Sequence, residues 1–144
     1  MNFIRKIVNP QKKEDEGLYY ELKKLLNFSP KKIDFYKKAF THRSLKLLDD
    51  NGDPLNYERL EFLGDAMLGS IIASYLYKKV PKGTEGYLTQ MRSKIVSREH
   101  LNELGKDLEL LKFVKSNFDR ENVGYNIYGN IFEVVASDDW FTKQ

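Results

Sequence analysis

Apolar or small residues occupy nearly every turn of the stretch 56–77, from Leu60 onward. This pattern predicts one long helix that is buried on most of its circumference, with the rest of the chain organised around it. Two carboxylates interrupt it: Glu61 and Asp65 lie four residues apart and share one face, and Glu58 lies on the adjoining stripe. Aligned acids repel one another and resist dehydration, so we expect a positive group to meet them.

The residues before this helix predict two shorter helices and a turn. The first helix follows a loose arm of about a dozen residues and ends at Ser29-Pro30; its apolar positions are Leu18, Leu22, Leu25 and Leu26. The second runs over 32–41, with the Tyr36 hydroxyl near water; its inward positions are Ile33, Tyr36, Ala39 and Phe40. The acidic loop 49–54 is interpreted as a turn rather than a calcium loop, because Leu47 stands where the first ligand is needed.

Three more helical patterns follow the long helix, which ends before Pro81. Thr84 and Ser97 are suitable N-caps for the first two, and a polar loop over 117–126 precedes the third. The expected inward positions are Leu88, Met91, Ile95 and Val96, then Leu101, Leu104 and Leu108, then Ile127, Ile131, Phe132, Glu133 and Val134. With at least five helical patterns and no run of alternating strands, the predicted fold class is all-α.

Composition narrows the class of protein further. A chain of 144 residues with 41% hydrophobic and 31% charged residues is expected to fold as one globular domain. The absence of cysteine excludes disulfides and thiolate metal sites, and favours a cytoplasmic location. A net charge of +3 permits a polyanionic partner without demanding one. The longest uncharged run, 66–77, is well short of the roughly 20 residues that a membrane span needs.

The acids of the long helix have a possible counterpart on the last helix. Glu133 lies three residues after Asn130, again on one face, and two helices that each offer oxygen ligands can enclose a hard cation. Magnesium is the best candidate, because it binds a few carboxylates, retains its waters and acts beside phosphates. The two histidines show no ligand spacing, which disfavours zinc. The simpler alternative is that the acids form a solvated helix face.

Residues 56–68, which read NYERLEFLGDAML, closely resemble the signature helix of ribonuclease III, the double-stranded-RNA endonuclease. The resemblance extends upstream to residues 40–44 (FTHRS) and downstream to Pro81, Glu85-Gly86, Leu88-Thr89, Arg92 and Val96. Residues 129–133 resemble the second acidic motif of the family. The similarity therefore covers about residues 18–134 and keeps the order and spacing of several motifs.

The resemblance implies a ribonuclease III endonuclease-domain fold and a magnesium-dependent cleavage of double-stranded RNA, with manganese as a possible substitute. Glu61, Asp65 and Glu133 would hold the metal and its waters, with Asp65 and Glu133 as catalytic residues. Glu58 and Glu85 would act in RNA-facing or outer parts of the site. The products would carry a 5′ phosphate and a 3′ hydroxyl, and processing of ribosomal and messenger RNA would be the expected role. Family members act as homodimers, and Phe62 matches the aromatic residue that enters the partner, although it could equally be a core residue.

Asn130 departs from the family pattern, because it stands where the family usually has a metal-binding aspartate. An amide oxygen can still bind magnesium, but the site loses one negative charge and with it metal affinity. The change could be a tolerated natural variant, an inactivating substitution or the mark of a domain kept for binding. The alternative function is accordingly a weakened or inactive ribonuclease III-fold domain that binds double-stranded RNA or serves dimerisation.

The end of the chain also departs from the pattern. After Glu133 the sequence VVASDDWFTKQ replaces the aliphatic helix, linker and RNA-binding domain that the family usually has. We therefore expect an N-terminal arm over 1–17 and an endonuclease-like domain over 18–144, altered or shortened after Glu133. Fewer phosphate contacts imply weaker, less salt-sensitive binding to RNA.

Overall fold

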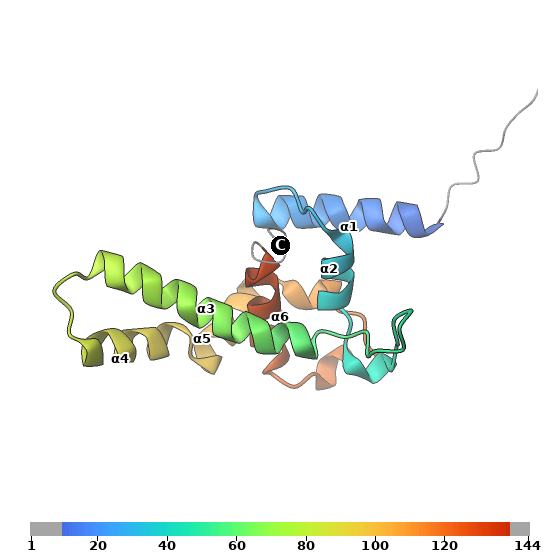
Figure 1. Ribbon diagram of the computed structural model, residues 1–144. Coiled ribbons are helices and arrows are strands. Elements are labelled where there is room, and N and C mark those ends of the chain that lie inside the picture. Colours follow the sequence, from blue (N-terminus) through green and yellow to red (C-terminus); the bar gives the residue numbers. More distant parts are fainter. Residues whose placement is uncertain (1–9, 139–144) are drawn as a thin grey trace, which may run out of the picture. The chain divides into compact units, whose positions relative to one another are not determined.

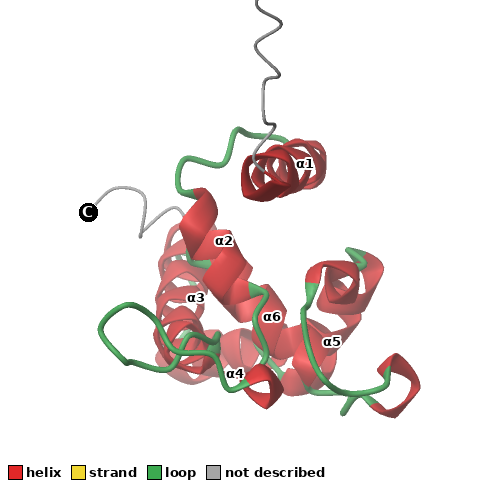
Figure 2. Cartoon of the chain, turned by 90° about the vertical axis from the view of Figure 1, so that its right-hand side faces the viewer, coloured by secondary structure: helices red, strands yellow, loops and turns green. Residues whose placement is uncertain are grey.

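The computed structural model describes residues 10–138, and within that range helices are the only extended regular elements (Figures 1 and 2). The helices are α1 (Pro10–Leu26), α2 (Ile33–Ala39), η1 (Arg43–Leu45), α3 (Glu58–Lys79), α4 (Glu85–Ile95), α5 (Arg98–Asp107), η2 (Leu110–Phe113), η3 (Arg120–Asn122) and α6 (Ile127–Ala136), where η marks a 3-10 helix. Two isolated bridges, Thr41 with Lys115 and Leu48 with Pro54, are the only strand-like pairings in this range. The predicted all-α class is confirmed.

The chain divides into two compact units, Met1–Asp34 and Phe35–Gln144. In the first unit, α1 begins at Pro10, so residues 10–17 of the predicted N-terminal arm are helical; the rest of that arm, residues 1–9, lies outside the described residues. Asn27 ends the helix with a left-handed φ of 61° and donates its backbone N–H to the carbonyl of Lys23. The predicted domain boundary at residue 18 stays a prediction.

Helix α6 is the centre of the second unit, and α3, α5 and η2 pack against it (Figure 1). The close packing depends on two glycines. A Cβ atom at Gly64 of α3 would collide with the backbone carbonyl of Glu133, and one at Gly105 of α5 would collide with the carbonyl of Tyr128. The core of this unit is made by Tyr36, Ala39, Phe40, Tyr57, Leu60, Leu76, Leu101, Leu110, Val114, Ile127, Ile131, Val134 and Val135.

The prediction that α3 is buried around most of its circumference is wrong. Its buried residues are Leu60, Gly64 and Leu76 alone, whereas Phe62 is 82% exposed and Tyr77 is 76% exposed. Ile71 and Tyr75 are also exposed, and helical spacing puts them on the side of α3 opposite Phe62, so large apolar side chains are uncovered on more than one side of the helix. Several exposed apolar side chains on one helix are typical of a surface that binds another molecule.

Helix α4 turns back along α3, and the predicted caps at Thr84 and Ser97 are confirmed (Figure 1). The Thr84 hydroxyl accepts the N–H of Tyr87 and the Ser97 hydroxyl accepts the N–H of His100, each at 3.3 Å. The predicted apolar stripe of α4, formed by Leu88, Met91, Ile95 and Val96, is half-buried. On α5, Leu101 is buried, but Leu108 is exposed because it follows the end of the helix, so its predicted inward position is wrong.

The Tyr36 hydroxyl is buried, contrary to the prediction that it lies near water. It donates to Asp138 at 2.5 Å, and burial is the main reason that the pKa of Tyr36 is raised, followed by this hydrogen bond. The carboxylate thereby replaces water as the partner of the hydroxyl.

The loop 49–54 is a turn, as predicted. The Asp49 carboxylate accepts the N–H groups of Asn51 and Asp53, both at 2.9 Å, and Gly52 adopts φ 83°. The carboxylate of Asp49 is therefore used to cap the turn. None of the helices in the described part of the chain is long and apolar enough to cross a membrane.

Candidate active site

Three helices meet at an open hollow of about 380 Å³ whose lining is mainly acidic. Helix α3 contributes three acids and an aromatic, α5 contributes a cation and α6 contributes a buried acid; the residues are Glu58, Glu61, Phe62, Asp65, Arg98 and Glu133. The close approach at Gly64 sets this geometry, since it brings the backbone of α3 against Glu133. Acids that are 72 residues apart in the sequence, such as Glu61 and Glu133, thus face one space.

Glu133 is the most strongly perturbed acid of the hollow. Its side chain is 1% exposed, and burial raises its pKa to about 7. Arg98 opposes this shift, while the charges of Asp65 and Glu61 increase it. The half-buried Glu61 behaves similarly: burial raises its pKa and Arg98 lowers it. A buried carboxylate with such a pKa is typical of a functional site.

The other two acids of the hollow, Glu58 and Asp65, are exposed. Asp65 is exposed, so the burial expected from its apolar neighbours is wrong. Glu58 is also exposed and accepts a hydrogen bond from Arg43 at 3.0 Å. Because that ion pair neutralises Glu58, the unbalanced negative charge of the hollow comes from Glu61, Asp65 and Glu133.

Sequence reasoning missed Arg98, the first residue of α5. Its Nη1 donates to Asn130 Oδ1 at 2.7 Å and to Glu133 Oε2 at 3.4 Å, while Nη2 lies 3.4 Å from Glu133 Oε1. The guanidinium therefore faces both oxygens of the buried carboxylate. The contact spans 32 residues from Arg98 to Asn130, and no local pattern marks it.

Asn130 lies between Arg98 and Tyr57. Its oxygen accepts from the guanidinium, and a hydrogen bond from Asn130 to the Tyr57 hydroxyl partly offsets the effect of burial, which raises the pKa of Tyr57. An amide provides both an acceptor and a donor, and this position uses both. Asn130 is thus linked to the hollow through Arg98 and does not line it.

The lining of the hollow suits magnesium, since carboxylate oxygens are ligands that this ion prefers; Asn130, which was predicted as a further ligand, is not among the lining residues. Within residues 10–138, however, no three His, Cys, Asp or Glu side chains converge tightly enough to form a ready metal cluster. Glu133 and Asn130 are bonded to Arg98 instead. His42 lies against Phe118 and Tyr57 and is not among the residues that line the hollow.

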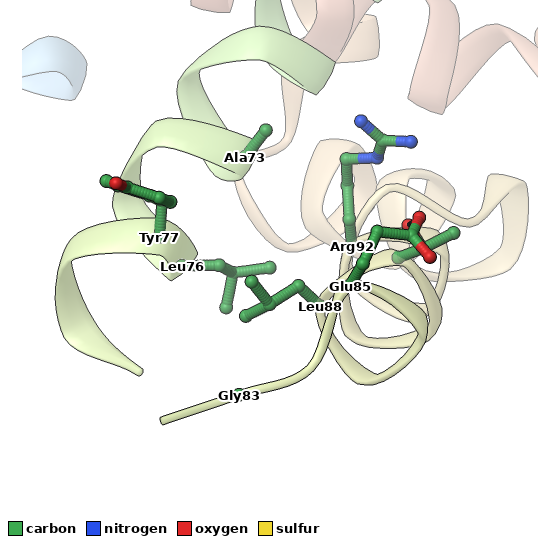
Figure 3. A pocket seen from close by; sticks show the side chains of 8 residues that line it. Ala73, Leu76, Tyr77, Gly83, Glu85, Leu88 and Arg92 are labelled. Atoms are coloured by element: carbon green, nitrogen blue, oxygen red, sulfur yellow. Dashed lines mark hydrogen bonds between the residues drawn. The ribbon is translucent and has the colours of Figure 1, made fainter. Parts of the chain in front are cut away.

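Glu85 is not among the residues that line this hollow. It lines a second, apolar pocket of about 450 Å³ between α3 and α4, where its carboxylate accepts from Thr89 at 2.8 Å (Figure 3). Leu76 and Leu88 from the two helices also line this pocket, with Arg92 at its polar side (Figure 3). The role predicted for Glu85 in an outer part of the active site stays a prediction.

The fold is all-helical, and carboxylates from two packed helices face one hollow. Helical proteins that bind a metal ion between facing helices have this arrangement. The chain matches the Ribonuclease-III-like family over residues 32–135. It is 61% identical to Ribonuclease 3 of Zunongwangia profunda and 56% identical to Ribonuclease 3 of Flavobacterium psychrophilum, in each case over 94% of this chain and 56% of the relative. The chain therefore belongs to the ribonuclease III-like family, and it spans about half the length of these curated relatives.

A solved structure agrees with this assignment. The nuclease domain of ribonuclease III from Campylobacter jejuni superposes with a TM-score of 0.71 at 27% identity, over 84% of this chain and 83% of that domain. That structure was described for flexibility in a region involved in dimer formation. The predicted fold, a ribonuclease III endonuclease-domain-like helical bundle, is confirmed.

Proposed function

We propose that this chain is a magnesium-dependent endoribonuclease domain that cleaves double-stranded RNA and leaves 5′-phosphate and 3′-hydroxyl ends. The observation that carries the proposal is the hollow in which Glu61 and Asp65 of α3 face Glu133 of α6, in a chain of the ribonuclease III-like family. We further propose that the domain acts in the cytoplasm on ribosomal and messenger RNA precursors.

The side chains of the hollow have distinct tasks in this proposal. Glu61, Asp65 and Glu133 would hold Mg²⁺, which when bound activates water for attack on a phosphodiester and neutralises the phosphoryl oxygens. Glu58, held by Arg43 at the edge of the hollow, would face the RNA. Exposed cations would contact phosphates and recognise the A-form shape of the duplex; the candidates are Lys31, Lys32, Lys78, Lys79, Lys82, Arg92 and Lys94.

Cleavage of a long duplex RNA by the purified chain tests the proposal. With Mg²⁺ we expect products with 5′-phosphate and 3′-hydroxyl ends, and with Mn²⁺ we expect the same products. EDTA should lower the rate by about 10³-fold or more, because a metal ion supplies several kcal/mol of transition-state stabilisation. A single strand of the same sequence is the control. Cleavage that persists in EDTA, or that does not distinguish the strand from the duplex, would contradict the proposal.

A second candidate function follows from the hydrogen bonds of Arg98. Its guanidinium donates to Asn130 and Glu133, so the oxygens of two predicted metal ligands are already bonded within the chain. The chain would then be a weakened or inactive ribonuclease III-fold domain that binds double-stranded RNA or serves dimerisation. Binding of duplex RNA at low salt with no cleavage in Mg²⁺ or Mn²⁺ would support this alternative over the enzyme. Failure to bind duplex RNA at low salt would leave dimerisation as its role.

We also propose that the chain forms a homodimer through the side of α3 that carries the exposed Phe62 and Tyr77. Helical spacing places these two aromatics on one side of the helix, and Tyr77 also lines the pocket of Figure 3. The described dimer region of the Campylobacter jejuni nuclease domain supports such an assembly. A self-complementary face of this kind is what a two-fold dimer requires.

Replacing Phe62 by aspartate is expected to weaken dimerisation by about 30-fold or more, because a central aromatic contact contributes about 2 kcal/mol or more. Sedimentation velocity over a concentration series measures the change. Leu48→Asp is the matched control, since Leu48 is exposed in the turn after η1. Equal dimerisation of Phe62→Asp and the control would show that this face is not the interface.

A further inference from the structure

Arg98 places a permanent positive charge inside the acidic hollow. Its guanidinium donates to Asn130 Oδ1 at 2.7 Å, and its two terminal nitrogens each lie 3.4 Å from a different oxygen of Glu133. Arginine does not lose its proton in proteins, so this charge is present at every working pH. The carboxylate that it faces is 1% exposed and needs such a partner.

The backbone of α6 leaves room for this guanidinium. A Cβ atom at Gly129 would lie 3.0 Å from Arg98 Nη1 and 2.7 Å from Asn102 Oδ1, so a larger residue there would press on both side chains. The buried Asn102 accepts the N–H of Gly129 at 2.8 Å and fixes this turn of α6. The guanidinium thus lies in space that the missing side chain of Gly129 leaves open.

Helix stability does not explain the position of Arg98. It is the first residue of α5, directly after the Ser97 cap, where the positive end of the helix dipole disfavours a cation. A cation at this end of a helix requires compensation, and Asn130 and Glu133 of α6 provide it. The position of Arg98 is therefore explained by its contacts with Asn130 and Glu133 at the hollow.

The charges in the hollow define how much positive charge it can accept. Glu58 is paired with Arg43, which leaves the three carboxylates of Glu61, Asp65 and Glu133 against one guanidinium. With all three carboxylates ionised, as they are when they hold a cation, three negative charges and one positive charge leave two negative charges. A single divalent cation balances that remainder, whereas a second would leave the hollow positively charged.

We propose that Arg98 is a resident cation of the site, which holds Asn130 and Glu133 in place of a second metal ion, so that each chain binds one divalent cation. The inference rests on the proposed function, because it assumes the metal site at Glu61, Asp65 and Glu133. Asn130 is then a positioning residue whose oxygen receives the guanidinium. Its amide oxygen accepts from the guanidinium without adding a negative charge, whereas an aspartate at this position would add one.

The number of ions bound by the full chain tests the inference without any measurement of cleavage. Mn²⁺ binding is followed by the loss of the electron paramagnetic resonance signal of the free ion, in the absence of RNA. Wild type is expected to bind one Mn²⁺ per chain. Arg98→Gln should bind the first ion about tenfold more tightly, equivalent to ~1.4 kcal/mol, and Arg98→Gln/Asn130→Asp should bind two ions.

Two further variants separate charge from structure. Arg98→Lys keeps a positive charge and should retain the one-ion stoichiometry, while Arg120→Gln on η3 removes an arginine outside the lining of the hollow and should change nothing. Circular dichroism confirms that each variant is folded. Two ions on the wild type, or one ion on the double variant, would overturn the inference and leave the proposed function intact. No ion on either protein would overturn both.

Discussion

Gly64→Ala is expected to lower the free energy of unfolding by about 3 kcal/mol. The added Cβ would collide with the backbone carbonyl of Glu133, so α3 and α6 would have to separate. Backbone of a packed helix cannot rotate away as a side chain can, and the core between these helices would lose its fit. Because the same contact positions the acids of both helices, cleavage should fall with stability.

Gly69→Ala is the matched control on the same helix. A Cβ at Gly69 meets nothing within 4 Å, so alanine should raise the stability by about 0.5–1 kcal/mol through its higher helix propensity. Urea unfolding followed by circular dichroism measures both variants. If Gly64→Ala were as stable as Gly69→Ala, the close approach of α3 and α6 would be refuted.

The sequence was sufficient to predict the helices because their signals are local. Periodic apolar residues and the caps Thr84 and Ser97 depend on neighbours within a few positions, and the structure confirms both caps. The shared face of Asn130 and Glu133 follows from helical spacing in the same way, and Arg98 contacts both residues. Local spacing thus accounts for most of the fold.

Local spacing could not predict which helix lies at the centre of the fold. A helix with apolar residues on most sides can be covered by its own chain or by another molecule, and both arrangements give the same pattern. In this chain α6 is the covered helix, while α3 leaves Phe62 and Tyr77 exposed. The error about α3 therefore results from treating every apolar face as part of one core.

The cation that meets the acids was expected, but its source was not. Repulsion among Glu61, Asp65 and Glu133 requires positive charge, and the sequence offered only a metal ion as the candidate. The structure adds Arg98, whose contact with α6 depends on how α5 packs and on the space above Gly129. Such tertiary contacts leave no periodic signal. The partner of a buried acid is therefore harder to predict than the acid.

Glu133→Gln is expected to reduce cleavage of duplex RNA by about 10³-fold, which corresponds to ~4 kcal/mol of lost transition-state stabilisation. The amide keeps the shape of the side chain but removes the negative charge that Mg²⁺ needs. Glu103→Gln is the control, because Glu103 is an exposed acid of α5 that does not line the hollow. Single-turnover cleavage at saturating protein compares the variants.

The same substitution, Glu133→Gln, should raise the free energy of unfolding although it lowers cleavage. Burial raises the pKa of Glu133 from an ordinary 4.5 to about 7, so between these values the folded state holds a proton that the unfolded state has released. The free energy of unfolding of the metal-free protein therefore falls as pH rises through this window, by about 3 kcal/mol from Glu133. Glutamine does not titrate, so Glu133→Gln should remove this part of the pH dependence and be the more stable protein at pH 8.

Urea unfolding in EDTA at pH 5 and pH 8 measures the difference in stability between Glu133→Gln and the wild type. A variant that lost activity and stability together would identify Glu133 as a structural residue, whereas lost activity with gained stability identifies an acid whose charge serves the reaction.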